Sequence, residues 1–105
     1  MSGLPDLGRF SDPALLILAS LAGGEKHGYS MMEDIEMISG IKLGPGTLYG
    51  AIGRLEEHGF IEVIETNDRR KPYRLTGQGL SALEETLQKM NRFAQTGLQR
   101  VGDAK

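Results

Sequence analysis

The sequence predicts a mainly α-helical domain with one small β-hairpin, arranged as a winged helix-turn-helix that ends in a long C-terminal helix. Segments with helical apolar spacing fill most of residues 11–58, and two strand-like segments follow within residues 60–76. Residues 77–105 then carry apolar side chains at alternating spacings of three and four. Helices followed by a hairpin are the order of a winged helix, in which the hairpin forms the wing.

Length and composition limit the kind of protein this is. The chain has 105 residues, of which 39% are hydrophobic and 25% charged, values typical of one small globular domain rather than a disordered chain. It contains no cysteine, which excludes disulfides, thiol catalysis and cysteine-based zinc sites. Because a core of this size gives a single chain little stability, we expect a partner chain.

The N-terminal residues 1–10 have neither a basic start nor a continuous apolar centre, so no export signal is expected, and we interpret them as a flexible arm. The longest apolar stretch, residues 14–22, has about half the length that spans a membrane. The sequence therefore predicts a cytoplasmic protein without a membrane partner.

Capping residues and apolar spacing predict the first two helices. Ser11 is expected to cap a helix that ends at Gly23 and is apolar around most of its circumference, as in a core helix. Residues 29–39 form the second helix, which Gly40 terminates. Residues 41–43 alternate between apolar and polar side chains and predict a strand of two or three residues.

A third helix is expected from Thr47, which can cap it, to His58. Gly50 and Gly53 each cost about 1 kcal/mol relative to alanine in a helix, which indicates that something approaches this face closely. The alternative is that they are tolerated surface glycines. The inward stripe of this helix consists of Leu48, Ile52 and Leu55.

Two strands at residues 60–65 and 72–76 complete a domain that we place at residues 11–76. The loop between them is basic. Residues 66–74 carry four basic side chains against Asp68, a local charge of 4 − 1 = +3, although the whole chain has a net charge of −2. An anion-binding surface should therefore include this loop, and the alternative is an ordinary solvated turn.

Residues 77–105 are expected to form a dimerisation helix, because its apolar seam requires another helix to cover it. We expect this helix to fray beyond Arg100, where glycine and polar residues follow. Together with the first helix it would form a homodimer. The expected dimer-interface residues are Leu15, Leu18, Leu80, Leu83, Leu87, Met90 and Ala94.

Two motifs look like the recognition-helix signature of PadR-like transcriptional regulators: LGPGTLYGAI at residues 43–52 and RLEEHGFI at residues 54–61. HGY at residues 27–29 and YRLTGQG at residues 73–79 are also similar to that family, so the resemblance covers roughly residues 14–87. The chain departs from larger members in having one C-terminal helix and no tryptophan. The resemblance implies a dimeric winged-helix DNA binder, usually a repressor.

Residue chemistry indicates which side chains would contact double-stranded DNA. Thr47 and Tyr49 would bring hydroxyls to a phosphate beside the free amides of a helix start, or else cap and pack. Arg54 would reach the DNA backbone or a base edge, or else form a salt bridge with Glu57 or His58. The expected DNA-binding residues are Lys42, Thr47, Tyr49, Arg54, Arg69, Arg70 and Lys71.

Catalytic and metal motifs are lacking in the sequence. There is no Ser-His-Asp set and no glycine-rich phosphate loop, so we expect no enzyme and no cofactor. His27 and His58 have no cysteine or paired carboxylate at ligand spacing, which argues against a metal site and favours surface or capping roles. Tyr29 begins a helix and is interpreted mainly as a core residue.

The leading hypothesis is a homodimeric, sequence-specific transcriptional repressor that binds a palindromic operator, since two-fold protein symmetry requires one. Its third helix would enter the major groove and its wing, residues 66–72, would lie on the backbone or in the minor groove. Two alternatives remain open. One is a protein-interaction module without DNA binding, suggested by the net negative charge. The other is a regulator that responds to a small-molecule effector at the dimer interface.

Overall fold

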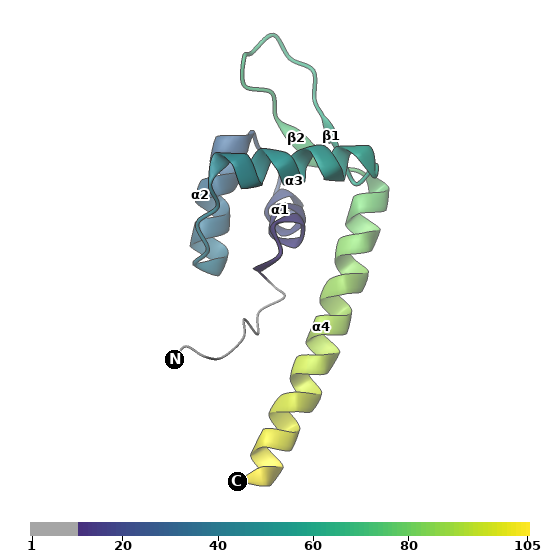
Figure 1. Cartoon of the computed structure of the whole chain (residues 1–105). Coiled ribbons are helices and arrows are strands. Elements are labelled where there is room, and N and C mark those ends of the chain that lie inside the picture. Colours follow the sequence, from purple (N-terminus) through teal and green to yellow (C-terminus); the bar gives the residue numbers. More distant parts are fainter. Residues whose placement is uncertain (1–10) are drawn as a thin grey trace.

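The computed structural model describes residues 11–105, so the arm expected at residues 1–10 lies outside the described residues. Four helices and one hairpin follow one another in the predicted order, which confirms the mainly helical fold. Figure 1 shows α1, α2, α3 and the hairpin gathered in one body, from which α4 extends as a long rod. The elements are α1 (Pro13–Ala22), α2 (Gly28–Ser39), α3 (Pro45–Glu57), β1 (Ile61–Val63), β2 (Tyr73–Leu75) and α4 (Gly77–Ala104).

Helix α1 is the centre of the core, as its sequence predicts. It contacts α2, α3 and α4, and it is enclosed by them in Figure 1. Its Ile17 is fully buried, as are Met31 and Ile35 of α2 and Leu48 of α3. Leu83 from the first half of α4 completes this cluster. Among residues 11–105, no helix is both long and apolar enough to cross a membrane.

The start of α1 differs from the prediction by one residue. Asp12, not Ser11, is the cap, and its carboxylate accepts a hydrogen bond of 2.9 Å from the Ala14 N–H. The reason is Pro13, the first helical residue. Its ring fixes a helical φ and brings no N–H that needs an acceptor, so the residue directly before it becomes the cap.

Helix α2 ends where the sequence predicts, because Gly40 adopts a left-handed φ of 76° and its N–H bonds the Glu36 carbonyl. The strand predicted at residues 41–43 is wrong, since that segment is irregular. The edge of β2 that a further strand could use is occupied by Lys26. Its N–H and C=O pair with Tyr73 at 3.2 and 2.9 Å.

Helix α3 begins at Pro45, two residues before the predicted start, with Gly44 as its N-cap. Thr47 therefore lies inside the first turn and does not cap the helix. The physical reason is again a proline at the first helical position, where its fixed φ starts the helix. The helix buries Leu48, Ala51, Ile52 and Leu55, and its other face remains open.

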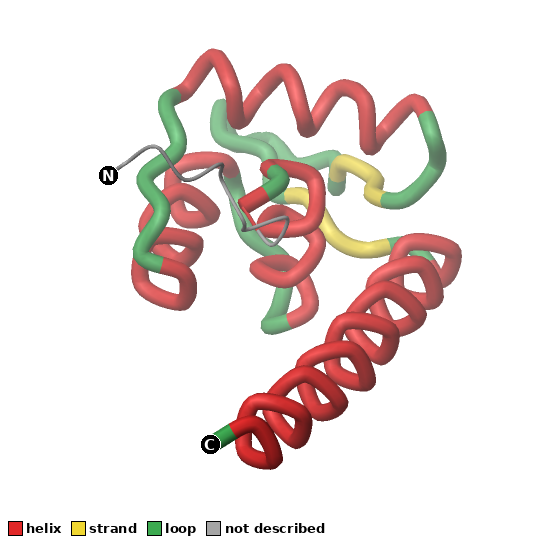
Figure 2. Tube along the Cα trace, turned by 60° about the horizontal axis from the view of Figure 1, so that its bottom comes forward, coloured by secondary structure: helices red, strands yellow, loops and turns green. Residues whose placement is uncertain are grey.

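The hairpin pairs β1 and β2 antiparallel, with Ile61 opposite Leu75 and Val63 opposite Tyr73. Both strands are shorter than predicted, because only one further hydrogen bond, from Ile64 N–H to the Pro72 carbonyl, extends the ladder before the chains separate into the wing. Figure 2 shows the short strands beside the helical body and the loop that leaves them.

Helix α4 is anchored at its N-terminus. Thr76 caps it by accepting from the Gly79 N–H at 3.0 Å and donates its hydroxyl to the Gly59 carbonyl at 2.6 Å. Gly79 lies against the Phe60 carbonyl, where a Cβ would overlap backbone. The helix continues to Ala104, so the predicted fraying beyond Arg100 is wrong. Gly97 costs about 1 kcal/mol, but the residues around it are adequate helix formers and sustain the helix.

Candidate nucleic-acid interface

The outward face of α3 is open to solvent. Thr47, Tyr49, Gly50 and Arg54 are all exposed there. A Cβ placed on Gly53 would meet no other atom within 4 Å, and one on Gly50 would meet only the Arg54 side chain at 3.7 Å. Within the described residues, the close approach expected at these glycines is therefore not made by the chain itself, and the face is free for another molecule.

Arg54 projects from this face as an exposed cation. Neither of the alternative salt bridges, to Glu57 or to His58, is formed in the part of the chain that the structure describes. His58 instead bonds the Arg54 carbonyl through Nδ1 at 2.7 Å. The guanidinium thus keeps its donors available to an acceptor outside the protein.

Tyr49 connects α3 to the beginning of α2. Its ring lies against Gly28, so closely that a Cβ at Gly28 would overlap the Tyr49 hydroxyl. Half of the Tyr49 residue surface is nevertheless exposed. The hydroxyl end of the Tyr49 ring therefore packs against Gly28, and the contact of this hydroxyl with a phosphate stays a prediction.

His27 has the capping role that the sequence allows. Its Nδ1 accepts from the Ser30 N–H at 3.4 Å, and it is the N-cap of α2. Tyr29 is not a core residue, since 54% of its surface is exposed. It belongs to the first turn of α2, where its neighbour Gly28 is buried and Tyr29 is on the exposed side. Backbone N–H groups of a first turn have no acceptor within the helix.

These residues and the wing enclose a cleft of about 240 Å³, which we call the α2–wing cleft. Its lining includes three tyrosines, the first two residues of α2 and three basic residues of the wing, whose donor groups suit a phosphate oxygen. Sequence reasoning gave His27, Tyr29 and Tyr73 no part in binding, although the HGY motif at a helix start was the available signal. The cleft is lined by His27, Gly28, Tyr29, Tyr49, Arg69, Arg70, Lys71 and Tyr73.

Tyr73 remains protonated in this cleft. Burial raises the pKa of Tyr73 above its usual value of 10.0, and the charges of Glu56 and Tyr49 add to that effect. A phenol that keeps its proton is a hydrogen-bond donor at neutral pH. The cleft therefore contributes no negative charge of its own from this ring.

The basic side chains of the wing are not equivalent. The Lys71 ammonium donates to the Glu65 carboxylate at 2.9 Å and to the Thr66 carbonyl at 3.2 Å. Arg69 and Arg70 are exposed and form no ion pair within the described residues. Most of the free positive charge of the wing thus belongs to the two arginines.

Two further basic residues lie outside the cleft. Arg74 is exposed on β2, as expected, and pairs with Glu62 across the hairpin at 2.8 Å. That hydrogen bond raises the pKa of Arg74, which therefore stays charged. Lys42 is exposed between α2 and α3 and does not line the cleft.

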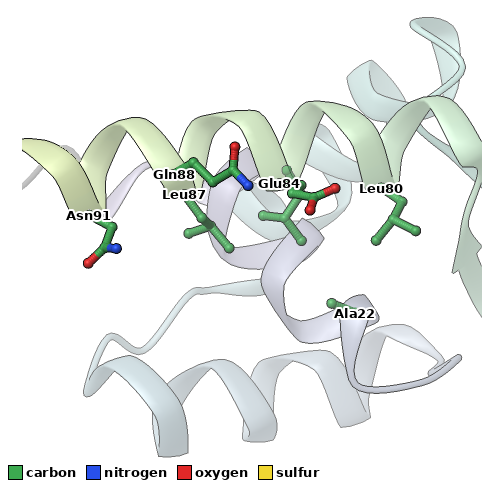
Figure 3. Close-up of a pocket in the computed structure, with 7 residues that line it drawn as sticks. Ala22, Leu80, Glu84, Leu87, Gln88 and Asn91 are labelled. Carbon is green, nitrogen blue, oxygen red and sulfur yellow. The ribbon is translucent and has the colours of Figure 1, made fainter.

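A second surface lies between α1 and α4. Figure 3 shows Leu80, Glu84 and Leu87 on the side of α4 that faces Ala22 of α1, around an open groove of about 580 Å³. Leu80 is 52% and Leu87 43% exposed. Farther along α4, Phe93 and Leu98 are also exposed apolar side chains.

The expected dimer-interface residues divide into two groups. Leu18 and Leu83 are buried in the core of their own chain, which leaves little of either for another protomer. Leu15 and Met90 are half-buried, and Ala94 is exposed. No cluster of three or more histidine or carboxylate side chains suited to a metal occurs in residues 11–105.

The family follows from a match that spans most of this architecture. Residues 17–85, from the core helix α1 to the first half of α4, match the family model described as "Transcriptional regulator PadR-like family". The chain belongs to the PadR-like family. The members of that family to which the chain is similar are transcriptional regulators, not enzymes.

Three individual proteins illustrate what this chain is similar to. A PadR family transcription regulator from Clostridium difficile has a TM-score of 0.75 and 26% identity, over 85% of this chain and 97% of that one. An uncharacterized 37.1 kDa protein in a transposon of Streptomyces fradiae is 41% identical over 86 residues, 82% of this chain. The transcriptional activator GvpE2 of Halobacterium salinarum is 30% identical over 69 residues, 66% of this chain.

The chain spans only part of the curated relatives. It covers 25% of the length of the Streptomyces fradiae protein and 35% of the Halobacterium salinarum activator. What those relatives share with this chain is therefore the PadR-like unit, and not their whole length.

Proposed function

We propose that this PadR-like regulator binds double-stranded DNA as a homodimer, sequence-specifically, and represses transcription. Residues 11–76 would be the DNA-binding unit and residues 77–105 the dimerisation helix. The single observation that carries the proposal is the α2–wing cleft, which tyrosines, the first residues of α2 and the wing arginines line beside the open face of α3. A phosphate in that cleft would hold α3 against the adjacent groove.

The division of labour follows from general DNA recognition. Contacts to phosphate fix the position of a protein on the duplex, and contacts to base edges read the sequence. The cleft and the wing, residues 66–72, would supply the first kind, with the wing on the backbone or in the minor groove. Arg54 on the open face of α3 would supply the second, since an arginine can donate two hydrogen bonds to guanine.

The net charge of −2 does not oppose this function, because charge distribution decides electrostatic attraction at the scale of one surface. Arg69 and Arg70 line the cleft and form no ion pair within the described residues, while Asp68 beside them lowers the local excess of positive charge. Glu65 neutralises Lys71, and Glu62 neutralises Arg74. The expected binding is therefore salt-sensitive but depends on few phosphate contacts.

The homodimer is supported by the length and exposure of α4. Its 28 residues correspond to about 42 Å at 1.5 Å per residue, yet only Gly79 and Leu83 are buried. The exposed residues Leu80, Leu87, Phe93 and Leu98 would be covered by a second copy of the chain. Two-fold symmetry would then place two copies of α3 on the half-sites of a palindromic operator.

The experiment that tests this function is selection of purified protein against a random duplex DNA pool at about 50 mM and 200 mM salt. Enrichment of a palindrome supports a dimeric, sequence-specific reader. Salt-sensitive binding without enrichment contradicts sequence specificity. Absence of binding at the lower salt contradicts DNA binding and leaves the protein-interaction module. A transcription assay on the enriched site then decides between repression and activation. The relative GvpE2 is named as a transcriptional activator.

A second candidate, an effector-responsive regulator, is favoured by the groove between α1 and α4. Its apolar side chains and the polar rim of Glu84, Gln88 and Asn91 would suit a small amphipathic molecule, and a ligand there would alter how two protomers pack. A compound that raises the thermal stability and shifts DNA affinity supports coupling. A compound that raises stability and leaves affinity unchanged contradicts it.

A further inference from the structure

Lys26 occupies the junction between the wing and the helical body. Both of its backbone polar groups pair with Tyr73, so the Lys26 peptide lies on the outer edge of β2. The next residue, His27, caps α2 and lines the α2–wing cleft. A displacement of Lys26 would therefore move β2 relative to the first turn of α2.

The Lys26 side chain is fixed as firmly as its backbone. Its ammonium donates to the Ser20 carbonyl at 2.6 Å and to the Gly24 carbonyl at 3.2 Å, at the C-terminal end of α1. A cation there is stabilised by the helix dipole and by these two carbonyl oxygens, of which that of Ser20 also accepts from the Gly23 N–H. The Asp34 carboxylate of α2 lies 4.0 Å from the same ammonium.

Ser20 connects these groups from inside the core. Its hydroxyl donates to Asp34 at 2.7 Å, and only 1% of the residue is exposed. The network thus joins α1 and α2 through the Lys26 side chain, and β2 through the Lys26 backbone. Lys26, Ser20, Gly24 and Asp34 do not line the α2–wing cleft, so direct DNA contact does not explain the contacts of the Lys26 side chain.

We propose that Lys26 is a positioning residue for DNA binding, which holds the wing against the N-terminus of α2 and so keeps the α2–wing cleft in shape. This inference rests on the proposed function. Tyr73 transmits the effect, since it pairs with Lys26 and lines the cleft beside Tyr49. The hairpin itself has only three paired positions, so it needs this additional attachment.

The test is a double-mutant cycle in DNA affinity. Lys26→Met keeps the aliphatic stem and removes the donors, and it is measured alone and together with the wing double variant Arg69→Ala/Arg70→Ala. If Lys26 acts by placing the wing, Lys26→Met weakens binding about tenfold in the wild-type background and less than about twofold when the wing arginines are absent. Lys26→Arg restores affinity, because a guanidinium also donates to the Ser20 and Gly24 carbonyls.

Controls separate positioning from charge and from folding. Lys89→Met removes the same charge from an exposed site on α4 and should leave affinity within about twofold. Equal losses from Lys26→Met in both backgrounds, or no loss at all, overturn the proposal. If circular dichroism shows that Lys26→Met is unfolded, the cycle is repeated with Asp34→Asn. A loss of affinity only while the wing arginines are present then supports the proposal, and an equal loss in both backgrounds, or no loss, overturns it. Failure of the wild-type protein to bind DNA contradicts the proposed function itself.

Discussion

The Tyr49 ring, in the second turn of α3, lies against Gly28, the first residue of α2. Only a residue without a side chain fits there, because any Cβ at Gly28 would overlap the Tyr49 hydroxyl. Both residues line the α2–wing cleft, so the contact brings α3 and the start of α2 onto one surface. It therefore links the packing of the domain to its proposed phosphate site.

Gly28→Ala is expected to weaken DNA binding while preserving the fold. Alanine is about 1 kcal/mol more favourable than glycine in a helix, and the displaced atoms are the end of an exposed, rotatable side chain. DNA affinity should fall about tenfold, the scale of one lost hydrogen bond to a charged group. Fluorescence anisotropy with the selected operator measures affinity, and thermal unfolding measures stability.

Tyr49→Phe is the matched control for Gly28→Ala, since it keeps the ring and removes the hydroxyl. The same loss of affinity is expected from both variants, and the double variant should lose no more than either one. Additive losses would show that Gly28 acts on DNA binding through something other than Tyr49.

In contrast to Gly28→Ala, which should preserve the fold, Gly79→Ala should destabilise it. A Cβ at Gly79 would meet the Phe60 carbonyl, which is backbone and has no rotamer to change. We expect a loss of about 2 kcal/mol or more in the free energy of unfolding, as for overpacked cores. Gly102→Ala, at an open helical position near the end of α4, should leave the melting temperature unchanged or raise it. A Gly79→Ala protein as stable as wild type would contradict the packing of α4 on the hairpin.

The sequence predicts the order of the helices and the hairpin, because apolar periodicity and glycine stops are local signals. The predicted first residues of α1 and α3 differ from the structure for one shared reason. Pro13 and Pro45 each take the first helical position, so the caps are Asp12 and Gly44 and not the hydroxyl residues Ser11 and Thr47. A rule that gives proline priority over a nearby hydroxyl would have placed both.

The site was only partly predictable, because its geometry depends on contacts between distant segments. The basic loop is visible as a charge excess, but the pairing of Lys71 with Glu65 is a property of the folded hairpin. The position of Tyr29 at a helix start favoured a core role, and only the fold shows that its side chain is exposed. The pairing of Lys26 with Tyr73 joins residues far apart in the sequence and displaced the strand expected at 41–43.

The wing arginines should dominate the salt dependence of DNA binding. The logarithm of affinity falls with the logarithm of salt by about 0.9 for each neutralised phosphate. Arg69→Ala/Arg70→Ala should therefore flatten the slope by about 2 for each protomer, if each arginine meets one phosphate. Lys71→Ala should change the slope by less than about half as much as Arg70→Ala alone, because Glu65 already pairs with Lys71. Equal effects of Arg70 and Lys71 in a titration by anisotropy would contradict this ranking.

Leu87 and Leu83 separate dimerisation from folding. Leu83 is 3% exposed, so Leu83→Ala should cost about 2–5 kcal/mol of stability. Leu87 is 43% exposed, so Leu87→Glu should leave the helical fold intact and place a charge in the proposed interface. Sedimentation should show that Leu87→Glu is a monomer, whereas the wild-type protein is a dimer. The control variant Gln99→Glu, on the side of α4 opposite the apolar seam, should also be a dimer. A dimeric Leu87→Glu protein would place the interface elsewhere, and its two copies of α3 would then need a different spacing on DNA.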